Sequence, residues 1–173
     1  CASGANAAVD APYVDRMRDR LAQADVLLLQ FEIPLPTIAH VLRTLPPDRP
    51  LVLVDPAPAQ VISELPLDRI DVLTPNQSEL EALTGEHDVA TGARRLMARG
   101  ARAVVCKLGD QGACWFGDEM HCVEPLPVNP VDTTAAGDAF NGALAVALGE
   151  RSIGEAVRWA NAAGGLAATC PGA

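Results

Sequence analysis

A segment in the last quarter of the chain has the residue types that phosphoryl transfer requires. Residues 132–144 read DTTAAGDAFNGAL, and within them Ala135, Ala136 and Gly137 open an apolar stretch typical of a helix. Small side chains leave the backbone N–H groups at a helix N-terminus free to hold an anion. Asp138 follows in the first turn, where a carboxylate can accept the proton of an attacking hydroxyl. A phosphate cradle beside a group that orients the nucleophile is the combination that phosphoryl transfer uses.

A plainer interpretation of the same segment stays open at this point. Asp138 can serve only to complement the positive end of the helix dipole, and the three small residues can serve only to let the helix pack closely. For an isolated Gly-Asp pair this interpretation would be preferred. For the thirteen-residue string taken as a whole, we favour the catalytic interpretation instead.

A second candidate segment, residues 74–79 (TPNQSE), follows a short apolar stretch. Asn76 can cap a helix with Glu79 as its capping-box partner. Glu79 can also hold Mg²⁺ through water, because this ion gives up its hydration shell reluctantly. The two interpretations are compatible, since a cap fixes the position of the acid.

A third candidate segment, residues 107–112 (KLGDQG), places a Gly-x-x-Gly turn after an apolar strand. Most turns of this kind are only turns. Lys107 could bind a phosphate as a point charge.

Composition narrows the class of partner. The 173 residues carry a formal net charge of −9 and only 3% aromatic residues. Nucleic acids and anionic membranes bind clustered Lys and Arg, so neither is expected as a partner. No apolar run reaches the roughly 20 residues that cross a bilayer.

The cysteines point to a reducing compartment. Their number is odd and none forms a Cys-x-x-Cys pair, which argues against a zinc site or a secreted disulfide framework. We expect Cys106, Cys114 and Cys122 to be small buried apolar residues of a cytoplasmic protein. The two other cysteines are Cys1 and Cys170.

The elements that must position these candidates alternate between strand and helix. Residues 1–8 carry no helix or strand signal. Helices are expected over 12–23, 37–44 (ended by Pro46 and Pro47), 78–84, 89–99, 136–148 and 153–168. Strands are expected over 26–31, 51–54, 71–73, 103–108, 113–116 and 120–123, with 128–131 a strand or a loop.

Fully apolar strands separated by helices predict a mostly parallel sheet covered on both faces. In such sheets ligands bind beyond the carboxyl ends of the strands. Polar or special residues gather at those ends: Glu32, Asp55, Asn76 and Gly109, with Asp132 just past another predicted strand.

These segments together resemble the phosphofructokinase-B (PfkB) sugar kinase family, and within it the ribokinase subgroup. The resemblance lies in DTTAAGDAFNGAL, in the Asn-x-x-Glu of TPNQSE and in the Leu-Gly-x-x-Gly of residues 108–112. It implies a three-layer α/β/α ribokinase-like fold with a mostly parallel central sheet. Residues 1–173 would form a single, partial α/β domain, the C-terminal portion that carries the ATP site and the catalytic base.

The resemblance also assigns roles to residues. Asp138 would be the catalytic base, and Ala135, Ala136 and Gly137 would supply the anion hole. The family's nucleotide and magnesium contacts fall on Asn76, Glu79, Lys107, Gly109, Gly112 and Asn161, with Lys107 in place of the usual Thr. Glu32 would contact the sugar, and Asp55 stands where ribokinases usually have Asn. A monovalent cation, K⁺ by analogy, would lie at Asp132, Thr134, Ala167, Cys170 and Gly172.

A typical family member has a further N-terminal part with most sugar contacts and a small β lid, which is missing here, and it dimerises through that lid. The implied activity is ATP- and Mg²⁺-dependent phosphorylation of a primary hydroxyl, D-ribose first. Two alternatives remain. One is a family kinase for fructose, a nucleoside or a keto-sugar acid. The other is a non-catalytic fragment that binds nucleotide or sugar.

Overall fold

The computed structural model describes residues 4–46 and 48–172. Among them the helices are α1 (Ala11–Ala22), α2 (Leu35–Thr44), α3 (Gln77–Thr84), α4 (Val89–Ala98), α5 (Ala136–Leu148) and α6 (Ile153–Ala167). The strands are β1 (Val26–Gln30), β2 (Leu51–Asp55), β3 (Val72–Leu73), β4 (Ala103–Lys107), β5 (Ala113–Phe116) and β6 (Met120–Val123). Three short 3₁₀ turns complete the list: Gly4–Ala8, Leu67–Arg69 and Gly109–Gln111.

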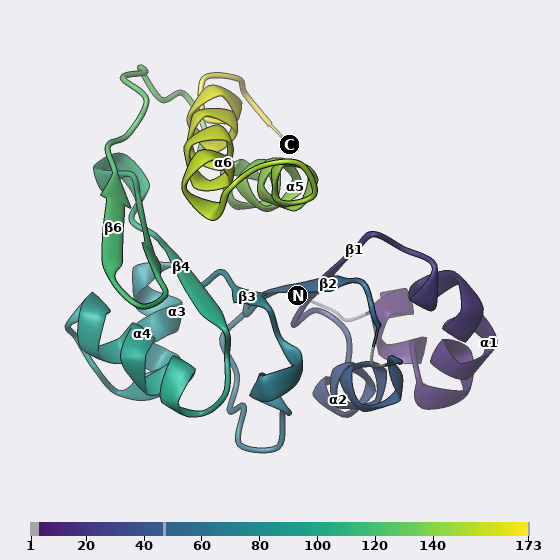
Figure 1. Cartoon of the computed structure of the whole chain (residues 1–173). Helices are drawn as coiled ribbons and strands as arrows, with labels where there is room; N and C mark the ends of the chain where they lie inside the picture. The colour runs from purple at the N-terminus through teal and green to yellow at the C-terminus, as the bar shows by residue number, and fades with distance from the viewer. Residues whose placement is uncertain (1–3, 47, 173) are drawn as a thin grey trace.

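The six strands form one sheet in the order β1-β2-β3-β4-β5-β6. The first four are parallel, and β5 and β6 add an antiparallel hairpin at one edge. Helices α5 and α6 cover one face of this sheet, and α2, α3 and α4 cover the other, with α1 packed beyond α2 (Figure 1). The predicted three-layer α/β/α arrangement with a mostly parallel sheet is therefore confirmed.

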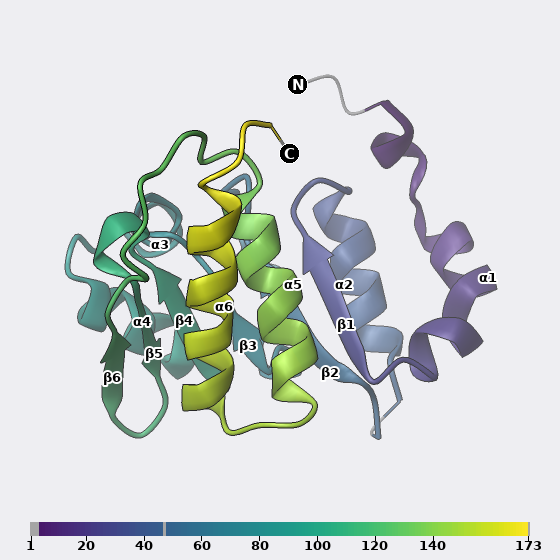
Figure 2. The same cartoon turned by 90° about the horizontal axis from the view of Figure 1, so that it is seen from above.

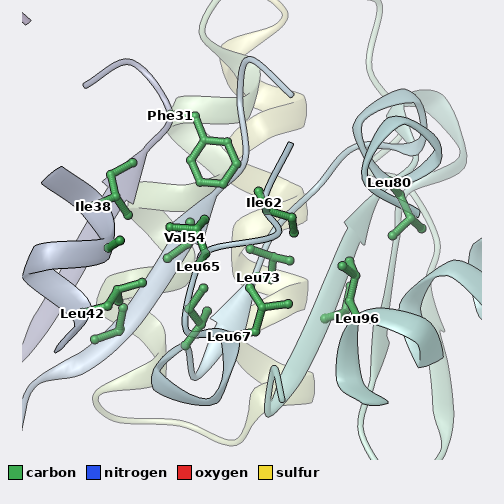
Figure 3. Close-up of a cluster of buried hydrophobic side chains, with 14 of the residues drawn as sticks. Phe31, Ile38, Leu42, Val54, Ile62, Leu65, Leu67, Leu73, Leu80 and Leu96 are labelled. Atoms are coloured by element: carbon green, nitrogen blue, oxygen red, sulfur yellow. The ribbon is translucent and has the colours of Figure 1, made fainter. Parts of the chain in front are cut away.

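Two apolar clusters hold the layers together, one on each face of the sheet. Side chains of a strand alternate between faces, so Val52 and Val54 of β2 join the cluster under α2, α3 and α4, whereas Leu53 joins the cluster under α5 and α6. Figure 3 shows part of the first cluster, in which Leu42 and Leu96 reach the sheet from their helices. Burial on both faces explains why these strands read as uninterrupted apolar runs.

Local signals account for the helix ends that frame the site. Helix α3 begins with a complete capping box between Asn76 and Glu79 and ends at Gly85, whose φ of 75° suits glycine. Helix α6 begins with a second capping box, formed by Ser152 and Glu155. Helix α5 has no side-chain cap at all.

Some expectations are wrong. The opening segment forms a 3₁₀ turn, Gly4–Ala8, although no signal predicts it. Residues 128–131 are a loop, one of the two forms expected for them, so only the placement of Asp132 just past a strand is wrong. Cys1 and Pro47, which also entered the sequence interpretation, lie outside the described residues.

The cysteines of the hairpin also differ from the prediction. Cys106 is fully buried as expected, but Cys114 and Cys122 form a disulfide, and Cys122 is exposed. They lie directly opposite each other on β5 and β6. Side chains paired in this way across antiparallel strands have adjacent Cβ atoms.

No helix among residues 4–46 and 48–172 is long and apolar enough to cross a membrane.

Candidate active site at the carboxyl edge of the sheet

The carboxyl ends of the parallel strands bring polar side chains to one edge of the sheet. Gln30 ends β1, Asp55 ends β2 and Lys107 ends β4. Asn76 follows β3 and forms an isolated parallel bridge with Lys107. Figure 2 shows the N-terminus of α5 and the C-terminus of α6 at this same edge. Residues up to about a hundred positions apart in the chain thus meet at one place.

The start of α5 leaves backbone donors free. Ala135, its N-cap, has a left-handed φ of 60° and gives the helix no side-chain hydrogen bond. The Ala136 N–H donates to the Thr133 carbonyl oxygen at 3.2 Å, and the Ala139 N–H donates to the Ala135 carbonyl oxygen at 2.9 Å. Within the described residues the N–H groups of Gly137 and Asp138 have no acceptor. Unpaired amides at the positive end of a helix dipole make an anion site.

Asp138 lies in the first turn of α5 with its carboxylate exposed. One oxygen, Oδ1, accepts a hydrogen bond of 2.7 Å from Nε2 of Gln30. No salt bridge to Asp138 forms within the part of the chain that the structure describes. The carboxylate is therefore oriented by a neutral amide and keeps its second oxygen available to a hydroxyl.

A buried ion pair lies beneath the helix tip. The Lys107 ammonium is 2.9 Å from Oδ1 of Asp55, and Nδ2 of Asn141 donates to Oδ2 of Asp55 at 2.6 Å. Burial raises the pKa of Asp55, against the opposing effects of the Lys107 charge and of the two hydrogen bonds; the negative charge of Asp138 also raises it. The ammonium is close to α5, because a Cβ atom placed on Gly137 would be 3.7 Å from Nζ.

A pocket of about 380 Å³ opens between the helix tip, the Gly109–Gly112 turn and the loop after β6. This volume falls within the range of small-molecule sites. Its walls are Lys107, Gly109, Asp110, Gly112, Pro125, Leu126, Pro127, Val128, Pro130, Thr133, Ala136, Gly137, Phe140, Gly164, Gly165 and Ala168. Gly164 lets α6 approach α5 closely, since a Cβ there would be 3.0 Å from the Ala136 carbonyl oxygen.

Three of the five predicted nucleotide contacts line this pocket, and two do not. Lys107, Gly109 and Gly112 are in its walls, together with Ala136 and Gly137 of the predicted anion hole. Asn161 is outside them, and its Nδ2 donates to the Glu124 carbonyl oxygen at 2.7 Å. Asn76 accepts hydrogen bonds at Oδ1 from the Glu79 N–H and the Ser78 hydroxyl, both at 2.8 Å.

Glu79 is a half-buried carboxylate with one oxygen engaged. Its Oε2 accepts from the Asn76 N–H at 2.7 Å, which completes the capping box. Burial raises the pKa of Glu79; the Asn76 hydrogen bond and the Lys107 charge oppose that effect, and the charge of Asp55 adds to it. Its second carboxylate oxygen fits a role in holding the water shell of Mg²⁺, which takes oxygen ligands.

The predicted sugar contact, Glu32, is exposed, and the predicted cation contacts are exposed or partly buried. Oε2 of Glu32 accepts a hydrogen bond of 3.3 Å from Asn6. Asp132 accepts at Oδ1 from the N–H and hydroxyl of Thr134 and at Oδ2 from the Gly172 N–H at 3.0 Å.

These hydrogen bonds, that from the Thr134 hydroxyl first, lower the pKa of Asp132. Three predicted cation residues, Asp132, Thr134 and Gly172, are therefore in contact. The Cys170 N–H donates to the Ala167 carbonyl oxygen at 3.1 Å. Among the described residues no cluster of three His, Cys, Asp or Glu side chains could hold a metal ion.

Two residues of the site received no role from the sequence: Asn141, which lies within DTTAAGDAFNGAL, and Gln30, which lies in the expected strand over 26–31. Gln30 orients Asp138, and Asn141 binds Asp55. The available signals were a polar residue at the end of the apolar run of β1 and an Asn on an otherwise apolar helix, where a buried amide needs a partner.

Comparison with known proteins identifies the same family that the sequence motifs resemble. A family model described as pfkB family carbohydrate kinase matches residues 2–173. A ribokinase of Haemophilus influenzae is 35% identical over 179 residues, covering 99% of this chain and 58% of the relative. The chain therefore spans little more than half the length of that curated relative.

Solved structures agree. A ribokinase from Thermotoga maritima matches with a TM-score of 0.91 and 39% identity, covering 99% of this chain and 58% of that one. Arabidopsis thaliana ribokinase complexed with ribose and ATP matches with a TM-score of 0.85 and 32% identity, covering 92% and 54%.

Proposed function

This chain belongs to the pfkB family of carbohydrate kinases, and from that premise we propose that the protein transfers the terminal phosphoryl group of ATP to a primary hydroxyl of a small sugar. D-ribose is the first candidate, because the Haemophilus influenzae and Thermotoga maritima relatives are ribokinases. The active molecule would use this chain as its ATP-binding and catalytic portion.

The observation that carries the proposal is that unpaired backbone amides lie beside a carboxylate with only one of its oxygens engaged. The N–H groups of Gly137 and Asp138 have no acceptor among the described residues, and the Asp138 carboxylate next to them is oriented only by Gln30. The amides favour the negative charge that develops on the transferred group. The carboxylate is placed to accept the proton of the attacking hydroxyl.

The remaining residues of the edge support the same reaction. The pocket beside Gly137 has apolar walls over Pro125–Val128, which suit the base of a nucleotide, while Lys107 and the helix tip suit its phosphates. Mg²⁺, held through water by Glu79, would neutralise phosphate charge. Glu32, two residues after the end of β1, is proposed to hydrogen-bond a sugar hydroxyl.

Three further points complete the proposal. K⁺ would bind near Asp132, Thr134, Ala167, Cys170 and Gly172. The protein would form a homodimer and act in the cytoplasm.

Phosphorylation rates for a panel of ribose, fructose, a nucleoside and a keto-sugar acid test the choice of substrate. A nucleoside or fructose that outperforms ribose would reverse the assignment.

The direct test of the mechanism is Asp138→Asn in the full-length protein. The variant keeps the shape of the side chain but cannot accept the proton, so kcat should fall by about 10²–10⁴ while ATP still binds. Asp118→Asn, an exposed acid in the β5–β6 turn, is the matched control and should retain activity. Near-normal turnover by Asp138→Asn would exclude it as the base. ATP binding without turnover in the wild type would favour a non-catalytic binding role.

A further inference from the structure

Lys107 is the only lysine among the 173 residues, and it occupies a confined position. It ends β4, its side chain is 14% exposed, and its ammonium reaches across the end of β3 to Asp55 at the end of β2. A Cβ atom placed on Gly137 would be 3.7 Å from Nζ. The ammonium of the one lysine in these 173 residues therefore sits against the first turn of α5, beside Gly137 and one residue before Asp138.

Asp55 is built to hold this ammonium. Its side chain is 4% exposed, and each of its oxygens has one donor, Lys107 for Oδ1 and Asn141 for Oδ2. Asn141 is itself 1% exposed, and its own Oδ1 is the buried side-chain polar atom left without a partner among the described residues. An unpaired buried carbonyl oxygen costs free energy, and the one side-chain hydrogen bond that Asn141 makes among the described residues goes to the Asp55 carboxylate.

Electrostatics explains why an anchor is needed. The N-terminus of α5 carries a partial positive charge, which repels a lysine ammonium placed beside it. Lysine is also flexible and strongly hydrated, so a released ammonium would turn toward water. The Asp55 carboxylate opposes both tendencies from the far side of Lys107, and Asn141 fixes that carboxylate to α5 itself.

We propose that Asp55 is a positioning residue for nucleotide recognition: it holds the Lys107 ammonium against the tip of α5, where the ammonium binds an oxygen of the terminal phosphate. This inference rests on the proposed kinase function. The terminal phosphate is the one concerned because the phosphoryl group that is transferred must lie beside Asp138, and Lys107 lies next to the preceding residue. Lys107 would then recognise how many phosphates a nucleotide carries.

A purely structural role for the pair makes a different prediction. Buried ion pairs often serve only to satisfy each other, and removing one partner then lowers stability without regard to the ligand. A positioning role instead weakens ATP binding selectively and leaves AMP binding unchanged. The number of phosphates on the ligand therefore separates the two roles.

The experiment compares the dissociation constants of ATP, ADP and AMP, measured by calorimetry on the full-length protein. The variants are Asp55→Asn, Lys107→Met, the double variant and Lys107→Arg. Loss of a charge-assisted contact should weaken ATP binding by tenfold or more in Lys107→Met and in the same direction in Asp55→Asn, with AMP within about twofold of the wild type. The double variant should be no worse than Lys107→Met, and Lys107→Arg should recover part of the loss.

A labelling experiment tests the placement of Lys107 directly. Adenosine diphosphopyridoxal carries an aldehyde near the position of the terminal phosphate, and borohydride fixes the imine that the aldehyde forms with an amine. Peptide mapping should find the label on Lys107, with ATP protecting and AMP not protecting. Labelling of other amines without Lys107, or equal protection by AMP, would contradict the placement.

The outcomes separate this inference from the proposed function. A wild-type protein that binds none of the three nucleotides overturns both. A wild-type protein that binds ATP, with Asp55→Asn shifting ATP and AMP equally or not at all, overturns only the role of Asp55. Circular dichroism and melting temperature check the fold of every variant. If Asp55→Asn does not fold, Asn141→Ala replaces it, because it removes the donor that fixes Asp55 and should show a weaker form of the same ATP-selective loss.

Discussion

Ala135 shows how a single residue prepares the tip of α5. It is the non-glycine residue with positive φ among the described residues, at 60°. A left-handed conformation at a residue with a Cβ costs about 1–2 kcal/mol, and here no side-chain cap offsets that cost. Strain of this kind gathers at functional sites. The left-handed conformation of Ala135 turns the chain into α5. It leaves the N–H groups of Gly137 and Asp138 without an acceptor among the described residues.

Gly137 should be replaceable only by a residue that leaves the helix tip open. A Cβ there would make ordinary contact with Lys107 at 3.7 Å, so Gly137→Ala should fold normally and lose little activity. Gly137→Leu would extend into the space between Lys107 and the pocket. If that blocks one amide donor, kcat/KM for ATP should fall by about 10²–10³.

Steady-state kinetics on both variants, with circular dichroism as the folding check, tests this expectation. Wild-type kinetics for Gly137→Leu would mean that the bound phosphate does not approach the tip of α5.

Sequence patterns indicated which residues belong at the site but not how they pair. The motifs singled out Asp138, Asp55 and Lys107, and all three lie at the carboxyl edge of the sheet. The hydrogen bonds from Gln30 to Asp138 and from Asn141 to Asp55 join residues 108 and 86 positions apart. Such partners depend on strand order and on the angle of α5 across the sheet, which no local pattern encodes.

At the scale of elements, the β5–β6 hairpin depends on Gly112. Its φ of 86° and ψ of −132° suit only glycine, and a Cβ there would overlap the Val123 carbonyl oxygen. Gly112→Ala should therefore destabilise the protein by at least about 2 kcal/mol. Gly109, the first residue of the same turn, has a φ of 61° and open space around it.

Gly109→Ala is the matched control, and it should cost only about 1 kcal/mol, for backbone strain alone. Urea unfolding followed by circular dichroism measures both values. Equal costs would show that the contact with β6 contributes nothing, and that backbone conformation alone requires glycine at this turn.

Element bounds were predictable wherever glycine, proline or capping residues mark them. The hairpin strands Ala113–Phe116 and Met120–Val123 and helix α5 match the prediction at both ends. Helix α2 begins at Leu35, two residues before the predicted start, because Pro36 fits the first turn of a helix as well as it fits a loop. The 3₁₀ turns Gly4–Ala8 and Leu67–Arg69 were missed, since a single turn leaves no periodic pattern to detect.

Over the whole molecule, the pKa values of partly or fully buried carboxylates shift in opposite directions at the two edges of the sheet. At the carboxyl edge burial raises the pKa of both Asp55 and Glu79. At the amino edge Asp71 is held by Arg49 and Arg102 and accepts the Val52 N–H at 2.8 Å.

Burial alone would raise the pKa of Asp71, but the hydrogen bonds from Arg49 and Val52 and the charges of Arg49 and Arg102 together lower it. The amino edge thus stabilises its charge, and the edge proposed for catalysis bears the cost of burying its own.

Asp71 should therefore make folding stability depend on pH. A carboxylate whose pKa is lowered in the folded state contributes its full stability above its ordinary pKa, and that contribution disappears as the pH falls through the lowered value. Asp71→Asn should cost about 3 kcal/mol at pH 7, because Arg49 loses its buried partner. The difference between variant and wild type should shrink steadily below the ordinary pKa of 3.8.

Urea unfolding of the wild type and of Asp71→Asn at pH 7, 5, 4 and 3 tests the origin of this stability. Asp118→Asn, on the exposed hairpin turn, controls for the loss of one negative charge and should stay within about 0.5 kcal/mol of the wild type. A difference for Asp71→Asn that persists unchanged to pH 3 would mean that shape and packing account for its effect. A difference that closes with acid would assign it to the carboxylate charge, which ties β3 to Arg49 before β2 and to Arg102 before β4.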